Sequence, residues 1–261
     1  LTQPAVSKRV AKLEEQLGAK LVQRLGKKMI LTAAGRTLLS HAEKLFVDIK
    51  SAEKAVKEIS EGISGDLRLA TSHHIGLHRL PSYLKHFADE NPAVKLNLEF
   101  TDSEKSYDMV ASGTVELAIV TLAPNAPAMF NEQSLWRDPL VFACAVDHPL
   151  AHLKTLSLHN LADHPCVLPG LDTYTGRIVK RLFEQHSLRL NASMATNYLE
   201  TIKMLASVGF GWTVLPKTML GDQLIELSVA EVNMSRSLGV VSLNQADLSK
   251  PAQRFIHTLQ A

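Results

Sequence analysis

Apolar residues recur at helical spacing through the first eighteen residues of the chain. Val6, Val10, Leu13 and Leu17 form one stripe, and Gly18 is a typical helix stop. The pattern predicts one amphipathic helix over residues 1–18. Its opposite face carries side chains suited to phosphate oxygens and base edges, which are Gln3, Ser7, Lys8, Arg9 and Lys12.

Two short apolar runs follow, at residues 21–22 and 29–31, and a turn with Gly26, Lys27 and Lys28 separates them. This pattern predicts a small hairpin with a basic tip. A basic-faced helix followed by such a hairpin is typical of a winged helix-turn-helix. The alternatives are a solvated amphipathic helix and a membrane-surface segment, although the narrow stripe lacks the aromatic residues of the latter.

A second apolar pattern occupies residues 33–60, with intervals that alternate between four and three residues. This unbroken a/d seam, flanked by mixed charges, predicts a linker helix that forms a two-stranded coiled coil with a second copy. The alternative is a core helix of the following domain. The predicted dimerisation residues are Leu38, Ala42, Leu45, Ile49, Ala52 and Val56.

Beyond a Gly- and Ser-containing break at residues 61–65, short strand and helix patterns alternate. Such alternation predicts an α/β fold with parallel sheets, here in two similar lobes joined by a crossing segment at 123–127. The predicted strands are 67–70, 95–100, 116–120, 139–146, 165–168, 190–195, 212–215 and 238–243. The predicted helices are 77–90, 106–112, 177–186, 198–208 and one from about 249 that packs on the first lobe.

The charge of the chain is divided unevenly. Residues 1–36 hold eight Lys or Arg and two Glu, whereas the remaining residues hold 20 basic and 24 acidic ones. A basic head on an acidic body is typical of nucleic-acid binding. The chain has no long apolar span and no signal-peptide pattern, and its two cysteines form no disulfide framework, so we expect a cytoplasmic protein.

These residues resemble the bacterial LysR-type transcriptional regulators along the whole chain. QPAVS at 3–7 with LEEQLG at 13–18 resembles the family's recognition helix, and LVQR at 21–24 with LTAAG at 31–35 resembles its wing and linker. Weaker resemblances are residues 113–119 (with Glu116 where aspartate is usual), DHPLA at 147–151 and GFG at 209–211 with Pro216. The resemblance implies a winged helix-turn-helix, a dimerising linker helix and a two-lobed, periplasmic-binding-protein-like effector domain.

We expect three parts: residues 1–32 as the C-terminal part of the DNA-binding domain, 33–61 as the linker helix and 62–261 as the effector domain. Lobe I is expected at 66–123 and 225–261, and lobe II at 124–224. The resemblance also implies two bracing helices before Leu1, so we expect this chain by itself to bind DNA poorly.

The resemblance assigns DNA contacts to the first helix and the wing. Arg9 stands where the family often has glutamine, and it can pair with guanine or contact a phosphate. The full set is Gln3, Pro4, Ser7, Lys8, Arg9 and Lys12 in the helix and Arg24, Lys27 and Lys28 in the wing.

Polar residues follow the predicted strands of both lobes, and α/β lobes bind ligands at the carboxyl ends of their strands. The helix after Ser72 adds N–H groups that favour an anion, so we expect a small, polar, anionic metabolite. The alternative is that each hydroxyl only caps a helix. The predicted effector residues are Ser72, His73, His74, Thr101, Asp102, Thr121, Pro169, Gly170, Thr196 and Asn197.

Other chemistry is weakly represented. His74 and His78 have metal-ligand spacing on a helix, but no Cys, Asp or Glu lies nearby in sequence, so we assign no metal and no cofactor. Cys144 and Cys166 lie in apolar strands and are expected to be buried and reduced. No nucleophile elbow, phosphate loop or paired-carboxylate motif occurs, so we expect no enzyme.

The sequence therefore predicts a transcription regulator that binds double-stranded DNA at a promoter inverted repeat and is controlled by an effector. The expected partners are a second copy of the chain, further copies that complete a tetramer, and RNA polymerase, with no membrane. The alternative is a solute-binding sensor module without DNA binding.

Overall fold

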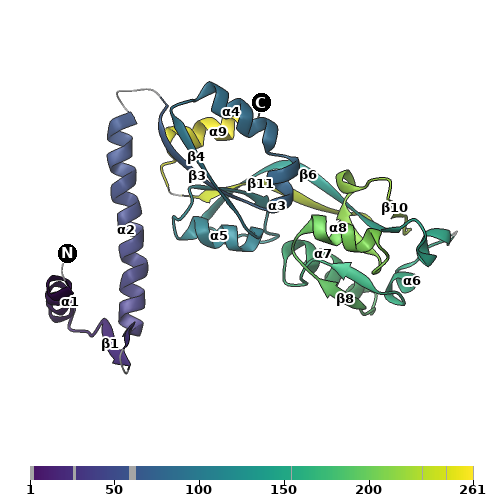
Figure 1. Ribbon diagram of the computed structural model, residues 1–261, viewed down its shortest axis with the longest axis horizontal. Helices are drawn as coiled ribbons and strands as arrows, with labels where there is room; N and C mark the ends of the chain where they lie inside the picture. The colour runs from purple at the N-terminus through teal and green to yellow at the C-terminus, as the bar shows by residue number, and fades with distance from the viewer. Residues whose placement is uncertain are drawn as a thin grey trace. The chain divides into compact units, whose positions relative to one another are not determined.

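The computed structural model describes residues 3–25, 28–58, 63–153, 155–230, 232–244 and 246–260. Of residues 3, 4, 25, 28, 47, 48 and 50–58 it describes only the backbone. The chain divides into two compact units, Leu1–Ser60 and Glu61–Ala261, and each is described by itself (Figure 1).

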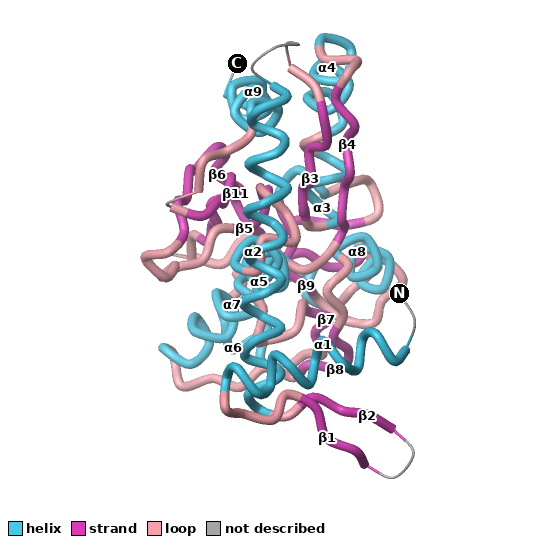
Figure 2. The backbone as a smooth tube through the Cα atoms, turned by 90° about the vertical axis from the view of Figure 1, so that its left-hand side faces the viewer, coloured by secondary structure: helices cyan, strands magenta, loops and turns pink. Residues whose placement is uncertain are grey.

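The first unit consists of a helix, a hairpin and a long helix. Helix α1 (Gln3–Leu17) ends before Gly18, which has a positive φ of 61°. Strands β1 (Val22–Leu25) and β2 (Lys28–Leu31) pair antiparallel, and Figure 2 shows them as a projecting hairpin. Thr32 accepts a hydrogen bond from the Gly35 N–H at the start of α2 (Ala33–Glu58). The predicted helix, hairpin and linker helix are thereby confirmed.

Glu14 fastens the first helix to the hairpin. Its side chain is only 8% exposed and accepts hydrogen bonds from the N–H groups of Leu21 (2.8 Å) and Val22 (3.2 Å). Lys20 adds an ion pair at 2.8 Å. These donors lower the pKa of Glu14 to about 2, with the Lys20 hydrogen bond as the largest cause. The orientation of the hairpin on α1 therefore depends on an ionised carboxylate.

We expect Glu14→Gln to accelerate hydrogen exchange at the Leu21 and Val22 amides at pH 7, because the neutral amide is a weaker acceptor. Glu15→Gln, on the exposed side of the same helix, should leave both rates unchanged. The folded pKa lies below the unfolded value of about 4.5, so the stabilisation is present above pH 4.5 and is lost as the pH falls towards 2. Equal exchange rates in both variants would contradict this role.

The second unit is built on a seven-stranded sheet with the order β10-β6-β11-β5-β3-β4, and β9 also pairs with β6. The three strands β3 (Gly65–Thr71), β4 (Val94–Phe100) and β5 (Leu117–Thr121) are parallel, as predicted. All pairings of β6 and β11 are antiparallel, so the prediction of purely parallel sheets is wrong. The remaining bounds are β6 (Phe130–Ala145), β9 (Thr213–Pro216), β10 (Leu224–Leu227) and β11 (Met234–Leu243).

Strands β6 and β11 run through both lobes and join them (Figure 1). Residues 130–140 of β6 pair with the whole of β11, and residues 140–145 pair with β9 and β10. The predicted strand 139–146 is therefore only part of β6, and 123–127 is not the crossing segment. The first half of β6 is polar and half-buried, so it lacks the apolar run that marks a buried strand.

The first lobe has a core on each face of its sheet. Leu67, Leu69 and Phe255 pack on one face beneath α4 (Pro81–Glu90) and α9 (Lys250–Gln260), as expected for the last helix. Helix α5 (Ser103–Ala111) covers the other face (Figure 1). The predicted helix 77–90 begins too early, because α3 (His73–His78) ends before α4 begins at Pro81, whereas its end at Glu90 is confirmed. Proline lacks the N–H and its ring obstructs a continuous helix.

The second lobe packs around Trp212, whose ring stacks on Phe183 at 5.6 Å between centroids. Its other elements are α6 (Leu158–Ala162), β7 (Cys166–Leu168), α7 (Tyr174–Gln185), β8 (Ala192–Ala195) and α8 (Leu199–Ser207). Leu227 and Met234 belong to this core, although residues from 225 onward were expected in the first lobe. Because β10 pairs with β6 here, we propose a lobe boundary within β11 instead.

Among the described helices, none has the length and apolar character needed to cross a membrane.

Candidate functional site

A cleft lies between the two lobes, with about 500 Å³ of empty space including its open mouth. The loops that follow β3, β4, β5 and β7 reach it, as expected for the carboxyl ends of strands. Seven of the ten predicted effector residues line it, namely Ser72, His73, His74, Asp102, Thr121, Pro169 and Asn197.

The other three predicted residues lie beside the cleft lining. The Gly170 N–H donates to Asn197 Oδ1 at 3.1 Å, and the Thr101 N–H donates to the Thr71 carbonyl at 3.0 Å. Thr196 Oγ1 accepts a long hydrogen bond from the Tyr198 N–H at 3.4 Å. These residues shape the loops around the cleft.

Helix capping does not account for the polar side chains in the first lobe. Ser72 and Asp102 occupy the N-cap positions of α3 and α5, but neither side chain makes a capping hydrogen bond. In the second lobe, Thr173 does cap α7 by accepting from the Gly176 N–H at 3.0 Å. The side chains of Ser72 and Asp102 thus face the cleft with capacity for other partners.

Arg236 on β11 lines the cleft and was missed by the sequence analysis. Its Nε donates to Asp138 Oδ2 at 2.9 Å and its Nη1 donates to Thr175 Oγ1 at 2.7 Å. Asp138 is completely buried, and burial lowers the pKa of Arg236 from its usual value. A guanidinium has five N–H donors, so these two bonds leave donors for a ligand.

Polar contacts cross the cleft from lobe to lobe. Asn197 Nδ2 donates to Asp102 Oδ2 at 2.9 Å, and the Tyr174 N–H at the start of α7 donates to Glu104 Oε1. Glu104 therefore places a carboxylate at a helix N-terminus, where the backbone dipoles favour negative charge. These contacts hold the two lobes against each other at the cleft.

The two neighbouring histidines have different surroundings. The ring of His73 packs against Phe100 of the first lobe and Tyr198 of the second, with centroids at 5.4 and 4.7 Å. His74 is 3% exposed, and neither ring nitrogen has a hydrogen-bond partner. Burial is the main cause that lowers the pKa of His74 to about 4.

Cys144 and Cys166 are buried and unpaired, as predicted. Burial raises the pKa of Cys144 to about 11 and that of Cys166 to about 12. Both side chains are therefore protonated at neutral pH and are poor nucleophiles.

The predicted DNA-contacting residues lie in the first unit. Ser7, Lys8, Arg9 and Lys12 are exposed on α1, and Arg24 is exposed on β1. Gln3, Pro4 and Lys28 are described only by their backbone, and Lys27 lies outside the described residues. The basic face of α1 is thus accessible in this unit.

Helix α2 presents large apolar side chains to solvent. Leu45 and Ile49 are 61% and 57% exposed, and Leu38 and Ala42 are half-buried. The side chains of Ala52 and Val56 lie outside the described ones. An apolar stripe on a long helix is what a coiled-coil partner would cover.

Comparison with known families identifies both units. Residues 1–36 match the model of the bacterial regulatory helix-turn-helix protein, lysR family, and residues 60–261 match the LysR substrate binding domain. The chain belongs to the LysR family. LysR regulators bind DNA through the helix-turn-helix, bind small-molecule effectors and form oligomers.

Curated relatives of this LysR protein are transcription regulators. It is 28% identical to a probable nitrogen assimilation transcriptional activator of Synechococcus elongatus over 98% of this chain and 85% of the relative. It is 25% identical to the activator CmpR of Synechocystis over 100% of this chain and 87% of the relative. The family thus accounts for both the basic head and the two-lobed domain.

Solved structures confirm the two-lobed fold. The regulatory domain of Synechocystis CcmR in complex with 2-PG is 26% identical, with a TM-score of 0.68 over 76% of this chain and 96% of that one. The regulator HinK of Pseudomonas aeruginosa is 22% identical, with a TM-score of 0.66 over 100% of this chain and 88% of that one.

Proposed function

We propose that this LysR regulator is controlled by a small anionic metabolite that binds in the cleft between its two lobes. The observation that carries the proposal is the lining of the cleft. The Arg236 guanidinium lines it together with hydroxyl and amide groups from both lobes. The CcmR domain, which shares the fold at 26% identity, binds 2-PG, and 2-phosphoglycolate is a small anion. A ligand that contacts both lobes would increase the fraction of molecules with closed lobes. That shift would in turn change how the protein binds DNA.

The proposal has further parts. Gln3, Pro4, Ser7, Lys8, Arg9 and Lys12 are proposed to contact the major groove, and Arg24, Lys27 and Lys28 the DNA backbone. The α2 seam is proposed to join two copies of the chain. We also propose that the protein acts in the cytoplasm and that the bound metabolite is released unchanged, which is supported by the relatives being transcription regulators.

A thermal-shift panel of phosphates, carboxylates and amino acids tests the ligand class. We expect at least one small anion to raise the melting temperature of the second unit, since a ligand that binds only the folded state stabilises it. Tryptophan fluorescence can follow that unit selectively, because both tryptophans of the chain, Trp136 and Trp212, lie in it. A panel in which none of these compounds raises the melting temperature of the second unit would contradict the proposal.

Glu104→Gln should strengthen binding of the stabilising anion by a factor of about 2–5. The substitution removes a negative charge at the cleft and leaves a weaker competing acceptor at the N-terminus of α7, a change worth about 0.3–1 kcal/mol. Asp108→Asn is the matched control, because it removes the same charge from an exposed position later on α5. Unchanged or weaker anion binding in Glu104→Gln would oppose the assigned role of the α7 N-terminus.

A further inference from the structure

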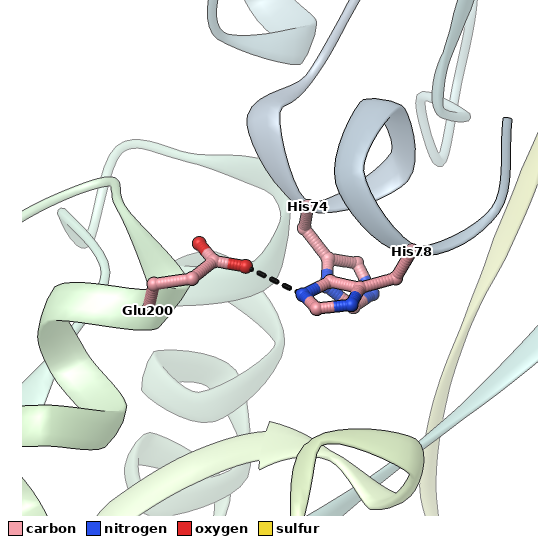
Figure 3. A group of neighbouring side chains, drawn as sticks. All are labelled: His74, His78 and Glu200. Carbon is pink, nitrogen blue, oxygen red and sulfur yellow. Dashed lines mark hydrogen bonds and ion pairs between the residues drawn. The ribbon is translucent and has the colours of Figure 1, made fainter. Parts of the chain in front are cut away.

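His74, His78 and Glu200 form a cluster (Figure 3). His74 also lines the effector cleft, whereas His78 and Glu200 are not among its lining residues. Both histidines project from α3 in the first lobe, one helical turn apart, and Glu200 reaches them from α8 in the second lobe. One ligand atom from each residue lies within 4.8 Å of the other two. His78 Nε2 and Glu200 Oε1 are already joined at 2.8 Å.

His74 is the member that points to a ligand. Its imidazole is 3% exposed, yet both ring nitrogens are without a hydrogen-bond partner. Leaving buried polar atoms unpaired is costly, and an occupant of the cluster would relieve that cost. The ring lies 5.2 Å from that of His78, and Figure 3 shows the two rings one behind the other, facing the Glu200 carboxylate.

We propose that His74, His78 and Glu200 bind one divalent transition-metal ion, of which Zn²⁺ is the best match, and that this ion ties α3 to α8. Two imidazoles and one carboxylate form a known zinc ligand set that leaves a fourth position open. Imidazole nitrogens select late transition metals over Mg²⁺ and Ca²⁺. The nearby positive charge of Arg236 is offset by its ion pair with Asp138.

The geometry needs only small adjustments. Zinc bonds of about 2.0–2.1 Å in a tetrahedron place ligand atoms about 3.3 Å apart. Atoms now within 4.8 Å would have to approach by about 1.5 Å at most, and the 2.8 Å contact would lengthen slightly. The side chains of His78 and Glu200 are 47% and 37% exposed, so they can move and the open position can hold water or an acidic ligand group.

The site connects the lobes differently from the direct polar contacts. The bond between His78 and Glu200 is one hydrogen bond at the edge of the cleft, whereas a bound ion would add His74 and fix three side chains. An ion at this position would favour the closed arrangement of the lobes. This inference goes beyond the proposed anion site, because it concerns a cation, and His78 and Glu200 are not among the residues that line the cleft.

Calorimetric titration of the chelator-treated, complete protein with Zn²⁺ alone tests the site. We expect one ion per chain at this site, and His78→Gln and Glu200→Gln should each weaken the binding by more than about 100-fold. Loss of an outer hydrogen-bond partner alone typically costs 10–100-fold, and loss of a ligand should cost more. Both side chains are partly exposed, so these variants are expected to fold, which circular dichroism checks.

His86→Gln is the matched control, because His86 forms an exposed i,i+4 pair with Glu90 at 3.4 Å on α4 but has no third ligand among the described residues. Its zinc affinity should stay within about twofold of the wild type. Failure of the wild type to bind Zn²⁺, or a loss below about tenfold in either cluster variant, would overturn the proposal. The titration contains neither DNA nor effector, so its outcome is independent of the proposed function.

Discussion

Arg236→Met should lower the free energy of unfolding of the second unit by about 3–5 kcal/mol, the largest stability effect that we expect. Asp138 is completely buried, and Arg236 is its closest cationic partner at 2.9 Å. Arg79, at 3.4 Å and 27% exposed, is a weaker second partner. Without Arg236, a buried carboxylate loses most of its compensation at the point where β6 and β11 join the two lobes.

Two further variants separate the buried ion pair from a general effect of removing arginine. Arg254→Met removes an exposed pair with Glu90 at 2.9 Å and should cost less than about 1 kcal/mol. The double variant Asp138→Leu with Arg236→Met should recover much of the loss, since an apolar pair requires no desolvation of charge. Denaturant titrations followed by tryptophan fluorescence measure all three. Similar losses for Arg236→Met and Arg254→Met would contradict the interpretation.

Ser7→Ala combined with Arg9→Ala should abolish footprinting of the operator by the complete protein. A single Arg–guanine pair contributes about 1–3 kcal/mol of discrimination, and a phosphate contact by Arg9 would be lost equally. Both residues are exposed on α1, so thermal unfolding should not change.

Lys44→Ala is the control for the loss of positive charge. Lys44 is exposed on α2, outside the predicted DNA-contacting residues, and its removal should leave the footprint intact. Arg9→Lys distinguishes the two roles of Arg9, because lysine replaces a phosphate contact better than a bidentate guanine contact. A normal footprint from the Ser7, Arg9 double variant would refute the assignment of this helix face.

Local patterns predicted much of the fold. The elements of the first unit were predictable because each pattern depends on neighbours in sequence. These patterns are the apolar stripe of the first helix, the basic turn of the hairpin and the a/d seam of the linker helix. The break between α3 and α4 was also present in the sequence as Pro81, and the apolar residues on either side concealed it. The length of β6 was not predictable in this way, because its first half is stabilised by pairing with β11, which lies about 100 residues later.

The same distinction applies to the cleft. Seven predicted residues line it because strand ends converge at one edge of a sheet. Arg236 was missed, although it lies on the same strand face as buried Met234 and Leu238, and an arginine at a buried strand position is itself a signal. Glu200 gave no local signal at all, since 122 residues separate it from His78. Only the packing of α8 against α3 brings the two together.

The footprint of the complete protein on its own promoter, recorded with and without the anion that stabilises the second unit, tests the account most directly. We predict protection of an inverted repeat that weakens with rising salt, because each phosphate contact releases counterions. The anion should change the extent or the boundaries of that protection. Absence of protection, or a pattern that the bound anion leaves unaltered, would contradict regulation of DNA binding by a ligand in the cleft.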